Sequence, residues 1–175
     1  MKFVLSAFLA TASAKMSFGS CPDVSNMESL DKSAYAGKWY EIQRDPMFPY
    51  TMGSTCTFKE YTLDSNGDLD LWFGAYQPMM FSYAGVGGKM YCDESMEETC
   101  EATMTDTGDY RAPFGVLATD YQSYDIAYFC MDMIEGVMKA EFVMIYGREP
   151  EMSEETLAEA RGIINEMVPS YALDW

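Results

Sequence analysis

The sequence predicts an all-β fold: an eight-stranded antiparallel up-and-down β-barrel with one C-terminal α-helix packed on its wall. Eight short runs of β-prone residues follow one another with links of hairpin length. Asn66-Gly67 lies between two of these runs and supplies the positive φ angles of a tight turn. After the last run, apolar residues take helical spacing, at Leu157, Ala160, Ile164 and Val168.

The first four runs are predicted as strands at residues 38–48, 55–63, 69–76 and 83–91. Gly37 lets the backbone turn sharply into the first strand, and Pro46 and Pro49 end it. The run at 83–91 contains three glycines, which suit a strand that coils around a small barrel.

The remaining strands are predicted at residues 100–105, 114–121, 124–131 and 139–146. Ser153 is the expected N-cap of the helix, with Glu154 and Glu155 at the positive end of its dipole. Pro169 stops the helix. An eight-stranded barrel has an interior just wide enough for one small ligand.

Composition narrows the function. The chain has 28 acidic and 11 basic residues, and this charge disfavours nucleic acid and anionic lipid as partners. It has no His, which excludes Ser-His and Cys-His relays and His-ligated haem or zinc. We therefore predict no catalytic residue, no metal site and no cofactor.

Residues 1–14 have the pattern of a secretory signal peptide: a cationic start, a short apolar run and a small-x-small end at Ala12-Ser13-Ala14. A buried N-terminal helix is the alternative. No later segment approaches the length of a transmembrane helix. We expect residues 15–175 to form one domain that is secreted, extracellular or in the lumen of the secretory pathway.

An oxidising destination favours disulfides. The chain has five cysteines, so at least one stays unpaired or pairs with another molecule. Cys92 and Cys100 flank a polar loop between two predicted strands, and a bridge across that hairpin is sterically plausible.

Three motifs in order carry a family resemblance: Gly37-Lys38-Trp39, Thr119-Asp120-Tyr121, and Tyr146-Gly147-Arg148 just before the helix. Together they resemble the lipocalin family, within the calycin fold, and in it the apolipoprotein D-like branch of small secreted carriers. The resemblance covers Cys21 to about Val168. It implies that Arg148 lies over Trp39 at the closed end of the barrel, and that Thr119, Asp120 and Tyr121 belong to the same end.

The resemblance also implies a bridge between Cys21 and Cys130. The family partner of Cys56 is a cysteine in the C-terminal tail, and this sequence has no such tail cysteine. If Cys92 and Cys100 form a bridge, Cys56 is left over. One lipocalin is a prostaglandin isomerase that uses a thiol on the equivalent strand. A thiol-dependent lipid isomerase using Cys56 is therefore an alternative to a carrier without catalysis.

The family register implies a ligand-binding wall of inward-facing residues: Tyr61, Phe73, Ala75, Gln77, Phe114, Val116, Ile126, Tyr128, Phe142, Met144 and Tyr146. Lys59 shares the parity of Tyr61 and could hold a ligand carboxylate, although one bulge would place it in solvent. A mostly apolar wall suits a small hydrophobic molecule of the fatty acid, sterol, retinoid, carotenoid or tetrapyrrole class.

A third possibility is a partner-binding protein whose barrel is filled by these side chains. The sequence leaves open whether a receptor or a membrane contacts the open end.

Overall fold

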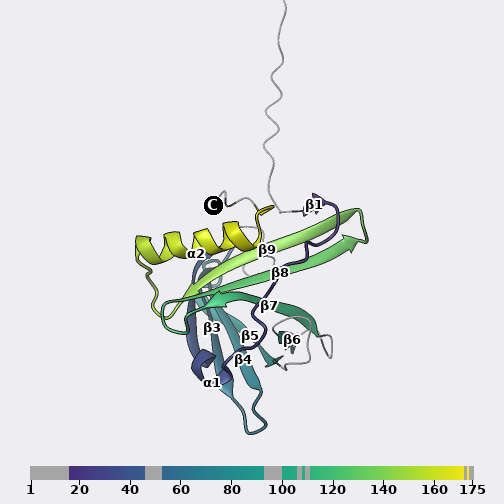
Figure 1. Ribbon diagram of the computed structural model, residues 1–175. Helices are drawn as coiled ribbons and strands as arrows, with labels where there is room; N and C mark the ends of the chain where they lie inside the picture. Colours follow the sequence, from purple (N-terminus) through teal and green to yellow (C-terminus); the bar gives the residue numbers. More distant parts are fainter. Residues whose placement is uncertain are drawn as a thin grey trace, which may run out of the picture.

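The computed structural model describes residues 16–45, 53–92, 100–105, 108, 111–171 and 173. The predicted signal peptide lies outside these residues. Figure 1 shows a strongly curved sheet with one long helix lying across it. The nine strands form one sheet in which each of β2 to β9 pairs with the next and β9 returns to β2. This circuit of eight strands closes the barrel, as predicted.

The barrel strands are antiparallel throughout: β2 (Gly37–Arg44), β3 (Thr55–Leu63), β4 (Leu69–Gln77), β5 (Ser82–Tyr91), β6 (Cys100–Met104), β7 (Ala112–Thr119), β8 (Tyr124–Ile134) and β9 (Met138–Gly147). β8 and β9 are longer than the sequence predicted, and Figure 1 shows them as a long hairpin that projects beyond its neighbours. β2 ends at Arg44, and the predicted remainder of that strand, 46–48, lies outside the described residues.

Two short elements were not predicted from the sequence. β1 (Met16–Phe18) pairs with Met138–Ala140 of β9. It lies on the same edge of β9 as β2, at the part of that edge with which β2 does not pair. The N-cap of α1 (Lys32–Tyr35) is Asp31, whose carboxylate accepts hydrogen bonds from the backbone N–H groups of Ser33 and Ala34. Such short elements have too few residues for a periodicity to show in the sequence.

The up-and-down order gives the barrel two distinct ends. The β3–β4, β5–β6 and β7–β8 connections lie at the end where α1 leads into β2, which we call the closed end. The β2–β3, β4–β5, β6–β7 and β8–β9 connections lie at the opposite, open end. Large apolar side chains are exposed on two of these open-end connections. They are Met79 (95%) and Phe81 (85%) between β4 and β5, and Val137 (51%) between β8 and β9.

Two apolar cores hold the fold together. The first fills the barrel, and the second lies between the outer wall and α2 (Glu154–Met167). The predicted N-cap is present, because Ser153 Oγ accepts the Thr156 N–H at 3.1 Å. Ala160, Ile164 and Val168 are buried in one cluster with Leu117 of β7, Ile126 of β8 and Val143 and Ile145 of β9. The helix therefore covers the wall, as its periodicity predicted.

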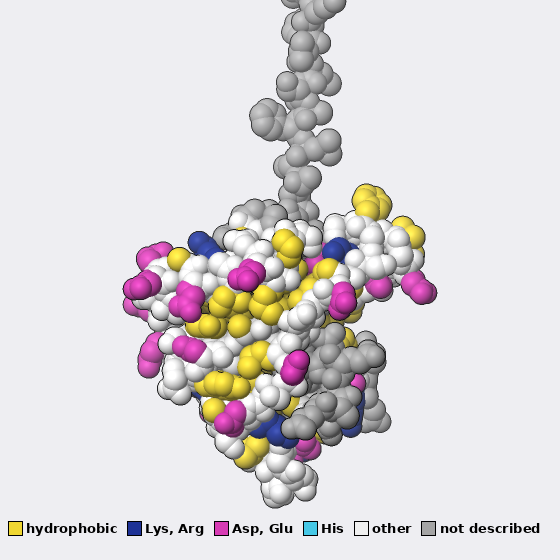
Figure 2. All heavy atoms as spheres, viewed as in Figure 1, with side chains coloured by type: hydrophobic (Ala, Val, Ile, Leu, Met, Phe, Trp, Pro, Cys, Tyr) yellow, Lys and Arg dark blue, Asp and Glu magenta, His cyan; other side chains and the backbone are white. Residues whose placement is uncertain are grey.

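Acidic side chains are spread over the face shown in Figure 2, in keeping with the net charge of −17. Among the described residues, no helix is both long and apolar enough to cross a membrane.

Candidate ligand-binding site

Trp39 and Arg148 form the floor of the closed end. The Trp39 ring is fully buried, and its Nε1 donates to the Tyr35 carbonyl at 2.9 Å. The Arg148 guanidinium carbon lies 3.7 Å from the centre of that ring. The same guanidinium donates to the carbonyls of Ala34 (2.7 Å) and Ala36 (2.9 Å), so it fixes α1 beneath the barrel. This arrangement has the stacking geometry of a cation–π contact.

Thr119, Asp120 and Tyr121 build the adjoining β7–β8 turn. Asp120 Oδ1 accepts three backbone N–H groups, from Gln122, Ser123 and Tyr124, at 2.7–3.0 Å. Burial raises the pKa of Asp120, but these donors outweigh it and leave the pKa below its ordinary value. The Tyr121 backbone has a φ of +65° and its hydroxyl accepts the Asp31 N–H at 3.2 Å. The hydrogen bonds of this motif therefore stabilise the β7–β8 turn.

The inner face of the closed half is packed. Tyr61, Val116 and Tyr146, which were predicted to face inward, belong to the barrel core and are at most 2% exposed. Phe114 packs against the same core. A side chain buried to this degree leaves no solvent-reachable space beside it. Tyr61, Val116 and Tyr146 therefore fill the inside of the closed half, with Phe114 packed beside them.

Lys59 points inward, and an acidic partner is already in place. Its Nζ lies 2.5 Å from Asp125 Oδ2 and 3.0 Å from the Tyr35 hydroxyl, and the Lys59 side chain is 2% exposed. The Tyr146 ring centre is 3.9 Å from the ammonium. Burial lowers the pKa of Lys59, and the Asp125 carboxylate opposes that shift.

Asp125 was not predicted as part of the interior. Its position in β8, opposite Tyr146 of β9, is the signal, because paired residues on antiparallel strands share a face. The Asp125 carboxylate thus occupies the position beside Lys59 at which the sequence analysis expected a ligand carboxylate.

A second ion pair lies inside the barrel, and its Arg44 is nearer the open end than the Lys59–Asp125 pair. Glu41 stands opposite Tyr146, and after a bulge Arg44 stands opposite Met144, so both side chains turn inward. The Arg44 guanidinium contacts the Glu41 carboxylate and also donates to the Ser54 carbonyl at 3.3 Å. Burial raises the pKa of Glu41, and Arg44 opposes the shift. The sequence analysis did not anticipate this pair.

The prediction that Ile126 and Tyr128 face inward is wrong. Both lie in the second core, outside the barrel, with Val143 and residues of α2. The Tyr128 hydroxyl donates to Glu141 Oε1 at 2.9 Å. Asp125 and Ala127 occupy the inner face instead, and Phe129 follows them with its ring stacked on Phe142. A strand that is covered by a helix on its outer side can bury apolar residues on both faces. The apolar character of Ile126 and Tyr128 therefore could not show which face of β8 they occupy.

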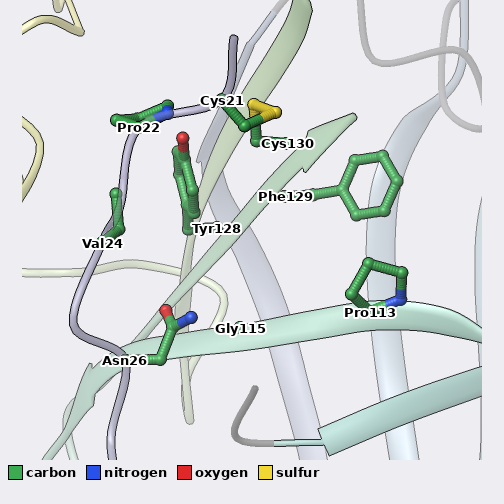
Figure 3. Close-up of a pocket in the computed structure, with 9 residues that line it drawn as sticks. All are labelled: Cys21, Pro22, Val24, Asn26, Pro113, Gly115, Tyr128, Phe129 and Cys130. Atoms are coloured by element: carbon green, nitrogen blue, oxygen red, sulfur yellow. A yellow bond between two sulfur atoms is a disulfide. The ribbon is translucent and has the colours of Figure 1, made fainter. Parts of the chain in front are cut away.

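A small pocket lies on this outer side, between the N-terminal segment and the barrel wall. Figure 3 shows its lining: Cys21, Pro22, Val24, Asn26, Pro113, Gly115, Tyr128, Phe129 and Cys130. A Cβ at Gly115 would come within 2.6 Å of Asn26 Oδ1, so glycine allows the segment to lie close against β7. In Figure 3 the Phe129 ring points away from Tyr128.

All five cysteines are accounted for. The disulfides are Cys21–Cys130 and Cys92–Cys100, as predicted. Cys56 has a free, exposed thiol in an irregular part of β3, where its φ is +51°. Among the described residues, no group of three or more acidic or Cys side chains is arranged to hold a metal ion.

The inner face of the open half differs from that of the closed half. Phe73 and Gln77 of β4 are half-buried, while Ala84 of β5 is exposed although it pairs with inward-facing Ala75. Opposite them, Phe142 (8%) and Met144 (4%) of β9 are buried. Solvent therefore reaches the inner wall of the open half on its β4–β5 side. The predicted ligand-binding residues that lie here are Phe73, Ala75, Gln77 and Phe142, whereas Met144 belongs to the packed core with Tyr61, Val116 and Tyr146.

Comparison with known proteins agrees with this geometry. Residues 30–174 match the model of the lipocalin-like domain. The chain belongs to the lipocalin family. It is 27% identical to apolipoprotein D of Mus musculus over 83% of this chain and 75% of the relative. It is 34% identical to insecticyanin-B of Manduca sexta over 70% of this chain and 61% of the relative.

Solved lipocalin structures share the fold. The structure of insecticyanin from Manduca sexta superposes with a TM-score of 0.73 at 20% identity, covering 89% of this chain and 84% of that one. Apocrustacyanin C2 superposes with a TM-score of 0.68 at 20% identity, covering 87% and 84%.

Proposed function

We propose that this lipocalin binds and carries a small hydrophobic molecule in the open half of its barrel, without catalysis. The observation that carries the proposal is the contrast along the inner wall: Tyr61, Val116 and Tyr146 at the base are at most 2% exposed, whereas nearer the open end Phe73 and Gln77 of β4 are half-buried and Ala84 of β5 is exposed. An apolar wall with a few polar groups is typical of sites for small apolar ligands. The wall residues are Phe73, Ala75, Gln77 and Phe142, with Tyr61, Phe114, Val116, Met144 and Tyr146 as the base.

We further propose that the protein works outside the cytosol. Two disulfides support this, since such bridges persist in oxidising compartments. The signal-peptide pattern at residues 1–14 points the same way. Secretion is tested by expressing the full chain in cultured cells. We expect a product in the medium that begins near Lys15; a cytosolic product that keeps residues 1–14 would contradict the proposal.

The carrier function is tested by native mass spectrometry of the secreted protein together with a titration of the uncharged dye Nile red. We expect one dye molecule per chain and a co-purifying molecule of low mass that competes with it. Absence of dye binding and of any bound small molecule would favour the filled-barrel alternative.

The enzyme alternative depends on the Cys56 thiol. This thiol is exposed on β3, and the chain has no His that could act as its base. We expect Cys56→Ser to bind Nile red as tightly as the unaltered protein. Turnover of a lipid substrate by the unaltered protein that disappears in Cys56→Ser would overturn the carrier proposal.

A further inference from the structure

The barrel's inner wall contains four charged side chains on its described strands: Glu41, Arg44, Lys59 and Asp125. They form two pairs, Arg44 with Glu41 and Lys59 with Asp125. Each inward-facing cation thus has a carboxylate of the protein as its partner. The charges inside the barrel cancel.

The positions of these pairs matter for a ligand. Lys59 and Asp125 are 2% and 0% exposed, beneath the half of the wall that solvent reaches. Arg44 is the more accessible cation, with 20% of its side chain exposed, but the Glu41 carboxylate contacts it. A ligand carboxylate entering the barrel would meet a guanidinium that is already neutralised, with Glu41 beside it.

Burying an anion without a free counter-charge is costly, whereas burying a hydroxyl or an ester costs far less. The polar group on the open half of β4 is the neutral amide of Gln77, which can donate to or accept from an uncharged ligand group.

From these observations we infer that the ligand is an uncharged lipid, such as a long-chain alcohol, an ester or another neutral molecule, and that the Glu41–Arg44 pair excludes fatty-acid anions. The inference rests on the proposed carrier function and makes it more specific. Glu41 acts as a specificity-determining residue because its carboxylate already pairs with the Arg44 guanidinium, which would otherwise bind the carboxylate of a ligand.

The test compares three ligands of the same chain length: dodecanol, methyl dodecanoate and dodecanoate. Each displaces Nile red from the full secreted protein at neutral pH. We expect dodecanol and the methyl ester to bind about 10-fold or more tightly than dodecanoate. Equal or tighter binding of dodecanoate would overturn the inference while leaving the carrier function intact. Failure of Nile red and all three ligands to bind would instead overturn the carrier function.

The variant Glu41→Gln supplies a gain of function. It keeps the shape of the side chain and removes the charge that neutralises Arg44, so dodecanoate binding should strengthen about 10-fold relative to dodecanol. The matched control is Glu60→Gln on the outer face of β3, where Glu60 pairs with Lys38 at 3.6 Å. The control should keep the original preference.

An unchanged preference in a folded Glu41→Gln protein would contradict the role of Glu41. If that variant does not fold, the comparison of methyl dodecanoate with dodecanoate on the unaltered protein still decides the inference, because the two differ at the charged group.

Discussion

The two halves of this barrel use the same strands for different purposes. At the closed end, Trp39, Tyr35 and Tyr61 are fully or nearly fully buried, and the buried Lys59–Asp125 pair lies beside the Tyr35 and Tyr61 rings. At the open end, Ala84 on the inner wall is exposed and Met79 and Phe81 extend into solvent. A packed base can support a stable fold while the wall above it stays open to a ligand. Stability and binding should therefore respond to changes in different halves.

The largest effect should come from Trp39→Ala. The change removes a fully buried ring together with its contact to Arg148, which should lower the free energy of unfolding by about 4–6 kcal/mol. Urea denaturation followed by circular dichroism measures it. Trp72→Ala is the control, because Trp72 is 48% exposed on the outer face and its loss should cost far less. Equal costs for the two would show that Trp39 is not the floor of the barrel.

The next effect concerns the buried ion pair. Lys59→Met leaves the Asp125 carboxylate buried without its cation and should cost about 3–5 kcal/mol. Lys59→Met combined with Asp125→Leu removes both charges and should recover most of that loss. Lys38→Met serves as the control on the outer face and should cost less than about 1 kcal/mol. A double variant as unstable as Lys59→Met alone would be inconsistent with this explanation.

A smaller effect, of about 1–2 kcal/mol, is expected for Asp120→Ala, which removes a carboxylate that accepts three backbone donors. The folded-state pKa of Asp120 is depressed, so its stabilisation is complete above the unfolded pKa of about 4 and is lost as pH falls through the folded value. The stability difference between the unaltered protein and the variant should shrink below about pH 4. A difference that grows on acidification would contradict this sign.

The smallest effect is expected at the open-end connections. Phe81 is 85% exposed, so Phe81→Ser should change the free energy of unfolding by less than about 0.5 kcal/mol. A thermal melt that falls by many degrees would show that this connection packs against something that stabilises the monomer.

Much of the fold could be predicted because its signals are local. The Asn66-Gly67 turn, the glycine-rich fourth strand and the Ser153 cap each act within a few residues, and all three lie where they were expected. The family motifs added the long-range contact between Trp39 and Arg148, which no local pattern contains.

The site was harder to predict because it depends on which face of each strand points into the barrel. Ile126 was predicted to face inward, yet α2 covers the outer wall and buries that side chain there. The same strand turns Asp125 inward, where Lys59 from a strand distant in sequence neutralises it. Charged residues inside a barrel are costly unless paired, and a pairing across 66 positions leaves no periodic trace in the sequence.

The location of the ligand in the open half is tested most directly by Nile red titration of Ala84→Trp. Ala84 is exposed on the inner wall, so a Trp there should fill the mouth of the barrel without straining a packed core. Tyr83→Trp is the matched control, since Tyr83 is the next residue on β5 and is exposed on the outer face.

We expect Ala84→Trp to weaken dye binding at least about 10-fold with a nearly unchanged melting temperature, and Tyr83→Trp to change neither. Dye binding that is as tight in Ala84→Trp as in Tyr83→Trp would show that the ligand does not enter the open half of the barrel.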